Sequence, residues 1–233
     1  VDEIKRHIGD DISLDLGDRS NSPEETSALI LQKLVQDASE RVGENITDAV
    51  ITVPAYFTDR QRTATANAAE IAGINVERLL AEPSAAVLAY GLQKQKLGTD
   101  TQETIFVCDL GGGTFDATLV ECEYNHNYVE TLSTDGNSEL GGSDWTARLE
   151  DLLLDEIEAD TGVDLRTASG MAEQYWRVRK SAREAKHRLS EQMATNVTVP
   201  YVVPQEGYSL DTKITRDEFN EATHDLLKSI ESP

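Results

Sequence analysis

The chain of 233 residues is long enough for one large or two modest domains, each with its own hydrophobic core. Its 43 acidic and 21 basic residues give a formal net charge of −22, which disfavours binding to nucleic acid or to anionic membranes. Because no apolar run is long enough to span a bilayer and the first residues do not resemble a signal peptide, we expect a soluble, cytoplasmic protein.

The acidic residues are spread along the whole chain instead of being collected in one tail. Charge of this kind repels itself in dilute buffer and is tolerated near 1 M salt, where the Debye length is only about 3 Å. We therefore expect adaptation to high salt, with an ordinary acidic protein as the alternative. The two cysteines, Cys108 and Cys122, are expected to be free thiols, as in a reducing compartment.

The first hundred residues predict helices alternating with short apolar strands. Ser22 caps the first helix, followed by Pro23, and Thr58 caps the second. The predicted elements are a helix over 23–42, a strand over 49–53 that is buried on both faces, a helix over 59–72, a strand over 74–81 and a helix over 83–92. This alternation indicates a mixed sheet with a parallel part. The polar segment 93–102 is the best candidate for a boundary between two lobes.

The rest of the chain begins with strands and ends with helices and one hairpin. Strands dominate over 103–137. They are followed by helices over 144–161 and 169–191, strands over 196–203 and 208–214, and a last helix that starts at a capping box on Thr215 and runs to about 230.

A glycine-rich turn between two strands is the most informative segment of the sequence. Asp109 precedes it, the turn itself reads Gly111-Gly112-Gly113-Thr114, and Asp116 follows. Glycines can adopt positive φ and let a phosphate approach the backbone, where a row of N–H groups binds it. Two carboxylates beside a polyphosphate require a cation, and magnesium held mainly through water is the expected ion. The alternative is an ordinary glycine-rich turn flanked by solvated aspartates.

Two further charged positions can be interpreted either as parts of a functional site or as ordinary structural or solvated charges. Glu82 lies at the end of a predicted strand, where α/β proteins place ligands, but it could equally stabilise the start of the next helix. Lys5 belongs to a small basic cluster that could neutralise a phosphoryl group or simply be solvated. The basic residues between 177 and 188 fit a nucleotide-facing surface or a salt-bridged helix equally well.

Taken together, these segments resemble the nucleotide-binding domain of DnaK-type chaperones, the seventy-kilodalton heat-shock family, across essentially the whole chain. The matching segments, in order, are Ile4-Lys5-Arg6-His7-Ile8-Gly9, Ala49-Val50-Ile51-Thr52-Val53-Pro54-Ala55-Tyr56-Phe57, Glu82-Pro83-Ser84-Ala85-Ala86, Leu88-Ala89-Tyr90-Gly91 and Asp109 to Asp116. The resemblance implies an α/β protein with the actin-like ATPase fold, in which two lobes with mixed sheets close on ATP and magnesium.

The resemblance also implies subdomain limits. The first lobe would span 1–97, with an outer part over 1–24 and an inner part over 25–97. The second would span 98–233, with an inner part over 98–138 that carries the phosphate hairpin, an outer part over 139–229 and the start of a return to the inner part over 230–233.

The resemblance assigns roles to residues that the sequence alone leaves open. The catalytic positions are Lys5, Glu82, Asp109 and Thr114, and the nucleotide-binding positions are Gly111, Gly112, Gly113, Thr114, Lys186 and Ser190. Asp109 and Asp116 would hold magnesium mainly through water, with potassium as a further candidate ion. Pro54 and Arg62 match a pair that relays nucleotide state to a substrate-binding domain.

The sequence also departs from the family pattern. Ser143 and Arg183 stand where the family has glutamates that contact the ribose. The first phosphate loop, a second adenosine motif and the substrate-binding domain are not in the sequence, so we expect an internal fragment that is incomplete at both ends and has exposed sheet edges. We expect this fragment to bind nucleotide weakly or not at all and to be weak or inactive as an ATPase.

The resemblance implies the domain of a chaperone that couples binding and hydrolysis of ATP to binding and release of unfolded polypeptides. The polypeptides would bind a separate domain, and a J-domain co-chaperone and a nucleotide-exchange factor would be partners, with no nucleic acid and no membrane. Two alternatives are a small-molecule kinase on the same fold and a degenerate interaction module that no longer hydrolyses ATP.

Overall fold

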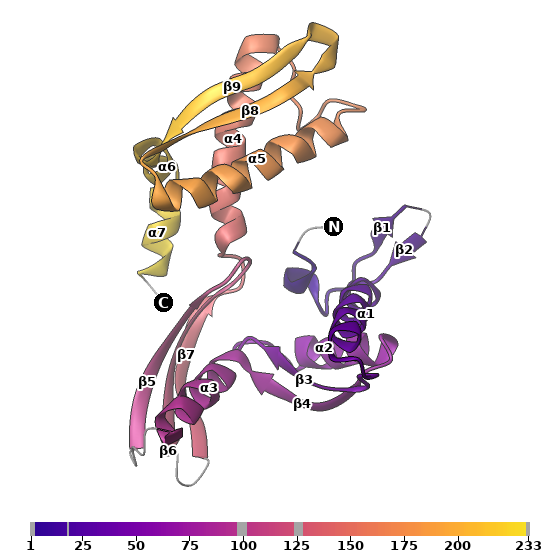
Figure 1. Cartoon of the computed structure of the whole chain (residues 1–233), viewed down its shortest axis with the longest axis vertical. Coiled ribbons are helices and arrows are strands. Elements are labelled where there is room, and N and C mark those ends of the chain that lie inside the picture. Colours follow the sequence, from indigo (N-terminus) through magenta and orange to yellow (C-terminus); the bar gives the residue numbers. More distant parts are fainter. Residues whose placement is uncertain (1–2, 18, 97–101, 124–127, 232–233) are drawn as a thin grey trace. The chain divides into compact units, whose positions relative to one another are not determined.

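The computed structural model describes residues 3–17, 19–96, 102–123 and 128–231, with the side chains of 93–96 left out. The chain forms two compact units, unit 1 over residues 1–139 and unit 2 over residues 140–233 (Figure 1). The subdomain limits expected within the two lobes remain predictions.

Unit 1 begins with one short 3-10 helix and a two-stranded sheet, which are followed by helices and strands. In order they are η1 (Ile4–His7), β1 (Leu14–Leu16), β2 (Arg19–Asn21), α1 (Pro23–Val42), β3 (Asp48–Val53), α2 (Asp59–Ile71), β4 (Asn75–Ala81), α3 (Glu82–Lys96), β5 (Gln102–Leu110), β6 (Phe115–Glu123) and β7 (Tyr128–Asn137). The sequence did not predict η1, β1 and β2, because segments of three or four residues show no usable periodicity.

The predicted helix starts are confirmed by their capping geometry. The Ser22 hydroxyl accepts a hydrogen bond from the Glu25 N–H while the Glu25 carboxylate accepts one from the Ser22 N–H. Thr58 and Gln61 form the same reciprocal box at the start of α2. Each box satisfies backbone donors that a helix start leaves without intrahelical partners.

The strands of unit 1 form small sheets. β3 and β4 pair in parallel, and β5, β6 and β7 form an antiparallel meander. The parallel pair is therefore confirmed, although the described parallel and antiparallel strands belong to separate sheets instead of one mixed sheet. The prediction that residues 49–53 are buried on both faces was wrong, because the Val50 side chain is 59% exposed.

The core of unit 1 is divided between two small clusters. One joins Ile8, Val53, Phe57 and Ala64, which links η1 and α2 to the end of β3. The other packs Val87 of α3 against the β5–β7 sheet. Gly136 in β7 has no room for a side chain, since a Cβ there would lie 2.2 Å from the Phe115 carbonyl oxygen.

Unit 2 is built from two long helices, a hairpin and two short helices. They are α4 (Gly142–Thr161), α5 (Ala172–Glu191), β8 (Ala194–Val203), η3 (Pro204–Glu206), β9 (Tyr208–Thr215), α6 (Arg216–Ala222) and α7 (His224–Ile230). One continuous cluster of buried residues forms its core, contributed mainly by α4, α5 and the β8–β9 hairpin.

The predicted single last helix is divided in two at Thr223. Its backbone departs from helical geometry, with φ −115° and ψ 8°, and its buried hydroxyl donates to the Phe219 carbonyl oxygen at 2.8 Å. A threonine that bonds back to the preceding turn commonly bends a helix.

Two further expectations concern the cysteines and the membrane. Cys108 is exposed and Cys122 is buried, and both are free thiols. Among the described residues, no helix has the length and apolar character needed to cross a membrane.

Candidate functional site

The glycine turn forms the tip of the β5–β6 hairpin in unit 1. Leu110 and Phe115 are opposite each other across the two strands, and the Gly111 N–H donates to the Thr114 carbonyl oxygen at 2.9 Å. The tip is also held from outside, because Arg6 Nε of η1 donates to the Gly113 carbonyl oxygen at 2.8 Å. The turn is thus anchored at both ends before any ligand binds.

The glycines of this turn are not required for unusual backbone angles. None of the three has a positive φ, and a Cβ on Gly112 would meet open space. A Cβ on Gly113 would lie 3.3 Å from Arg6 Nε. The expectation of positive φ was therefore wrong, and what the missing side chains leave at Gly112 is an unobstructed approach to the backbone.

Asp109 and Asp116 are directly opposite each other at the base of the turn. Like charges in this arrangement are destabilising. Asp109 is exposed, whereas Asp116 is only 2% exposed, and both oxygens of its carboxylate lack a hydrogen-bond partner among the described residues. A buried carboxylate without partners is costly in a folded protein.

The environment of Asp116 raises its pKa from 3.8 to about 6. Burial is the main cause, the carboxylates of Glu82 and Asp109 add to it, and Lys5 acts in the opposite direction. The Asp116 carboxylate therefore has two further carboxylates and one ammonium near it, which is more negative than positive charge.

Lys5 and Glu82 form an ion pair with 2.9 Å between Nζ and Oε1. Lys5 comes from η1, and Glu82 is the first residue of α3, immediately after β4 ends. Glu82 thus lies at the start of a helix, where its negative charge can stabilise that helix. It also contacts Lys5, to which the family resemblance assigns a catalytic role. The side chain of Lys5 remains 49% exposed.

Tyr56 is a neighbour of the site to which the sequence assigned no role. Its buried hydroxyl lies close enough to Thr114 to affect the tyrosine pKa, yet no described residue gives it a hydrogen bond of normal geometry. Burial, with the Asp116 and Glu82 carboxylates, raises its pKa to about 12. The position of Tyr56 just after the end of β3 is the signal that could have identified it.

Pro54 and Arg62 lie together beside this region. The guanidinium of Arg62 donates to the carbonyl oxygens of Phe57 at 3.1 Å, Ala55 at 3.0 Å and Pro54 at 3.5 Å. One side chain of α2 thus fixes the loop that contains Pro54 and Tyr56.

Lys186 and Ser190 belong to α5 of unit 2. Lys186 Nζ donates to the Gly142 carbonyl oxygen, and burial followed by the nearby Arg183 lowers the pKa of Lys186. The Ser190 hydroxyl is exposed and donates to the Lys186 carbonyl oxygen at 3.4 Å. Elsewhere on α5, Arg179 pairs with the buried Glu150 at 3.3 Å, as the salt-bridged interpretation of this helix expects, while the nucleotide-facing interpretation stays a prediction.

The residues around Asp116 suit a hard divalent cation. Their donors are carboxylate and hydroxyl oxygens, and the unpartnered oxygens of Asp116 provide an acceptor that a cation or its water could satisfy. In the part of the chain that the structure describes, no three His, Cys, Asp or Glu side chains are arranged to hold a metal directly. Magnesium that retains most of its water fits this donor set better than a fully ligated ion does.

A comparison with protein families identifies the chain. The family model described as Hsp70 protein matches residues 3–233. The chain belongs to the Hsp70 family.

Membership of the Hsp70 family confirms the actin-like ATPase fold and the α/β class expected from the sequence. The family consists in general of chaperone ATPases that use ATP or ADP with magnesium and act with polypeptide substrates and co-chaperones. It also favours the chaperone over the small-molecule kinase considered above.

Proposed function

We propose that the β5–β6 turn and the charged residues around it bind the phosphates of magnesium-ATP and support their hydrolysis. The observation that carries this proposal is Asp116, a buried carboxylate with a raised pKa and no described partner, beside the Lys5–Glu82 ion pair. The backbone N–H groups of Gly112, Gly113 and Thr114 would bind phosphate oxygens.

The reaction is an in-line displacement at the γ-phosphorus. The oxygen of a water molecule forms the new bond, the bond to the β,γ-bridging oxygen breaks, and ADP leaves with that electron pair. Glu82, Asp109 and Asp116 would orient the water and accept hydrogen bonds from it, and its proton passes to phosphate or solvent. Magnesium, when bound, supplies neutralisation of the phosphate charge.

Lys5 would stabilise the charge that develops on the transferred group. In the structure its ammonium is paired with Glu82 and half exposed, so it can move to a phosphate oxygen without leaving a deeply buried site. Thr114, whose side chain is 7% exposed, would donate its hydroxyl to the same group.

Steady-state release of phosphate from ATP by the full-length protein tests this assignment. We expect magnesium-dependent turnover that falls at least about 100-fold in Lys5→Ala and Glu82→Gln, because a preorganised charged group is commonly worth this factor. Arg60→Ala, an exposed change on α2, is the matched control and should retain turnover. Binding of magnesium-ATP without turnover would favour the non-hydrolysing interaction module, and no magnesium-dependent binding would refute the site.

We also propose that the Pro54 loop relays the state of the site to a domain that binds unfolded polypeptides. The support is structural: Arg62 fixes the loop through three carbonyl oxygens, and Tyr56 of the same loop lies beside Thr114. A J-domain co-chaperone and a nucleotide-exchange factor would act on this domain. In the full-length protein, Arg62→Ala should leave basal turnover within about twofold and abolish its stimulation by polypeptide, since Arg62 contacts the loop and not the phosphates.

The net charge of −22 supports a third proposal, adaptation to a salty cytoplasm. Screening of diffuse acidic charge should raise the free energy of unfolding between 0.1 M and 2 M KCl. A decrease over this range, measured by urea unfolding, would contradict the proposal.

A further inference from the structure

Arg6 extends from η1 to the glycine turn of unit 1. Its Nε donates to the Gly113 carbonyl oxygen at 2.8 Å, although the two residues are 107 positions apart in the sequence. The neighbouring Lys5 pairs with Glu82 at the start of α3. Two consecutive side chains of η1 thus contact two different parts of the candidate site, the backbone of the turn and a carboxylate.

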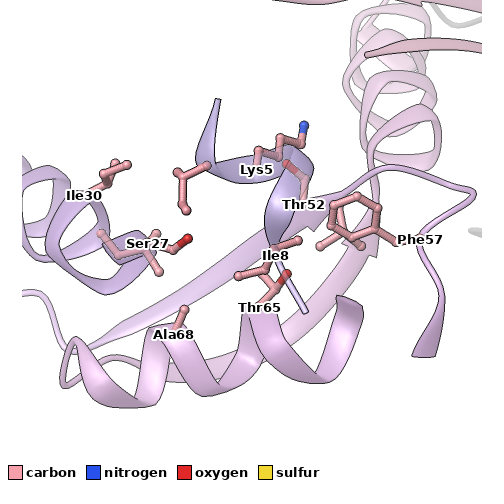
Figure 2. Close-up of a pocket in the computed structure, with 11 residues that line it drawn as sticks. Lys5, Ile8, Ser27, Ile30, Thr52, Phe57, Thr65 and Ala68 are labelled. Carbon is pink, nitrogen blue, oxygen red and sulfur yellow. The ribbon is translucent and has the colours of Figure 1, made fainter. Parts of the chain in front are cut away.

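Apolar contacts hold η1 in place on its other side. Ile8, which directly follows η1, is 4% exposed and packs with Phe57 and Ala64. Figure 2 shows the Ile8 side chain beside Phe57, whereas the ammonium of Lys5 points away from it. The charged side chains of η1 are therefore free to extend towards the candidate site while its apolar side stays packed. This gives Arg6 a fixed base.

The Arg6 contact fixes the direction of the peptide group between Gly113 and Thr114. Among the described residues all peptide bonds are trans, so the C=O and N–H of this group point to opposite sides. The Gly113 carbonyl points to Arg6, and the Thr114 N–H therefore points away from Arg6. This N–H is one of the donors that the proposed function assigns to phosphate.

A second hydrogen bond fixes the next peptide group, between Thr114 and Phe115. Its carbonyl oxygen accepts from the Gly111 N–H at 2.9 Å. Thr114 is thus held on both sides, by one contact within the turn and by Arg6 from outside it. The outside contact is needed because Gly113 places few limits on rotation of the peptide group that follows it.

The charge of the Arg6 guanidinium is already paired within η1 and its flank. Arg6 Nη1 lies 2.9 Å from a carboxylate oxygen of Glu3, and the two side chains are 15% and 22% exposed. A guanidinium has several donors in one fixed plane, so Arg6 can bind Glu3 and the Gly113 carbonyl at the same time. This favours a hydrogen bond to the turn over a direct contact between the Arg6 charge and phosphate.

Gly113 leaves the space that the Arg6 side chain occupies. A Cβ at this position would lie 3.3 Å from Nε and 3.9 Å from Cγ of Arg6, whereas a Cβ on Gly112 would meet nothing within 4 Å. The two glycines therefore differ in what they permit. Gly112 leaves the turn open to a ligand, and Gly113 admits the side chain that holds the turn.

We propose that Arg6 is a positioning residue that holds the Gly113–Thr114 peptide group with its N–H directed towards the phosphates before ATP binds. The inference rests on the proposed function of the turn, and it adds a residue to which neither the motifs nor the family resemblance assigned a role. With Arg6 in place the turn needs no rearrangement on binding, and donors that are fixed in advance contribute most to catalysis.

Turnover of magnesium-ATP by the full-length protein separates the hydrogen bond of Arg6 from its charge. Arg6→Gln places an amide nitrogen at the position of Nε, whereas Arg6→Met places a methyl carbon there and Arg6→Lys a methylene with the ammonium beyond it. We expect kcat/KM to stay within about threefold in Arg6→Gln and to fall at least about tenfold in the other two variants. Arg60→Ala, at an exposed arginine of α2, is the control and should retain turnover.

Hydrogen exchange of the Gly111 amide without nucleotide tests the same role independently of catalysis. Loss of the Arg6 contact loosens the turn, so exchange should be at least about tenfold faster in Arg6→Met and nearly unchanged in Arg6→Gln. Circular dichroism should show that the variants are folded, and the comparison of Arg6→Gln with Arg6→Lys does not depend on Arg6→Met.

The outcomes distinguish this inference from the proposed function. Unchanged exchange in Arg6→Met, or turnover that Arg6→Lys retains and Arg6→Gln loses, would overturn the role of Arg6 while magnesium-dependent turnover of the unchanged protein still supports the site. A full-length protein without magnesium-dependent turnover would refute the proposed function and this inference with it.

Discussion

Units 1 and 2 bury their apolar and charged residues in different ways. Unit 2 has one continuous core, and its buried carboxylate Glu150 is paired with Arg179. Unit 1 has two small clusters, and its buried carboxylate Asp116 is paired with no described residue. Among the described residues, all but four of the exposed large apolar side chains belong to unit 1, the exceptions being Trp176, Met193, Tyr201 and Leu227.

The difference teaches that unit 2 pairs its buried carboxylate internally, whereas unit 1 leaves the buried carboxylate of Asp116 available to a ligand. Arg166 pairs further carboxylates within unit 2, because it alone lies within ion-pair distance of Asp151, Asp155, Glu158 and Asp164. Unit 1 carries the proposed phosphate site. The buried carboxylate that lacks a hydrogen-bond partner and the proposed ligand site thus belong to the same unit.

The largest expected effect tests whether unit 2 depends on its continuous core. Leu153 is 1% exposed in that core, so Leu153→Ala should lower the free energy of unfolding by about 3 kcal/mol through lost transfer energy and a cavity. Both tryptophans, Trp145 and Trp176, belong to unit 2, so fluorescence in urea reports this unit. A shift smaller than 1 kcal/mol would show that the core is less tightly packed than described.

The next effect concerns pH and Asp116. The folded carboxyl keeps its proton up to about pH 6 and the unfolded one only to 3.8, so its contribution to stability is lost as pH rises between these values. Asp116→Asn removes that loss, and its stability relative to the parent should rise by about 2–3 kcal/mol from pH 4 to pH 7. Urea unfolding followed by circular dichroism measures this, and Asp10→Asn, at an exposed position, is the control.

A smaller effect is expected at Arg62, which fixes the Pro54 loop of unit 1. Arg62→Ala removes a charged donor from three carbonyl oxygens and should destabilise unit 1 by about 1–3 kcal/mol. Arg60→Ala on the same helix should change stability by less than about 0.5 kcal/mol. Equal effects of the two changes would mean that the loop is held by something other than Arg62.

The smallest effects compare matched helix caps in the two units. Thr58 and Thr215 accept hydrogen bonds from the third helical N–H at 3.3 Å and 3.2 Å. Thr58→Ala and Thr215→Ala should each cost about 1 kcal/mol. Only Thr215→Ala should shift the tryptophan fluorescence transition, and a shift with Thr58→Ala would show that the units unfold together.

The sequence predicted those parts of the fold that depend on local chemistry. Ser22, Thr58 and Thr215 identified helix starts because a capping box is a contact between near neighbours. The short strands β1 and β2 and the exposed face of β3 were not predictable, since pairing and burial depend on residues distant in sequence. Val50 lies in an apolar run of the kind that is typical of a strand buried on both faces. In the structure Val53 of this run packs against Ala64 of α2, whereas Val50 is exposed, and the sequence does not show this difference.

The candidate site was partly predictable for the same reason. The charges at Asp109, Asp116, Lys5 and Glu82 could be recognised from motifs, but the burial of Asp116 and the raised pKa that results could not. Asp109 and Asp116 are opposite each other, but Asp116 is on the central strand β6 and Asp109 on the edge strand β5, and this difference depends on pairing between residues distant in sequence. The contact of Arg6 with Gly113 joins residues 107 positions apart and has no local signal.

Hydrogen exchange of the Gly111–Thr114 amides, with and without magnesium-ATP, tests the central claim most directly. The account predicts slower exchange in this turn on addition of saturating magnesium-ATP, no change when magnesium is chelated, and loss of the protection in Asp116→Asn. The β8–β9 hairpin serves as an internal reference. Equal exchange rates in the turn with and without magnesium-ATP, or protection that persists in Asp116→Asn, would contradict it.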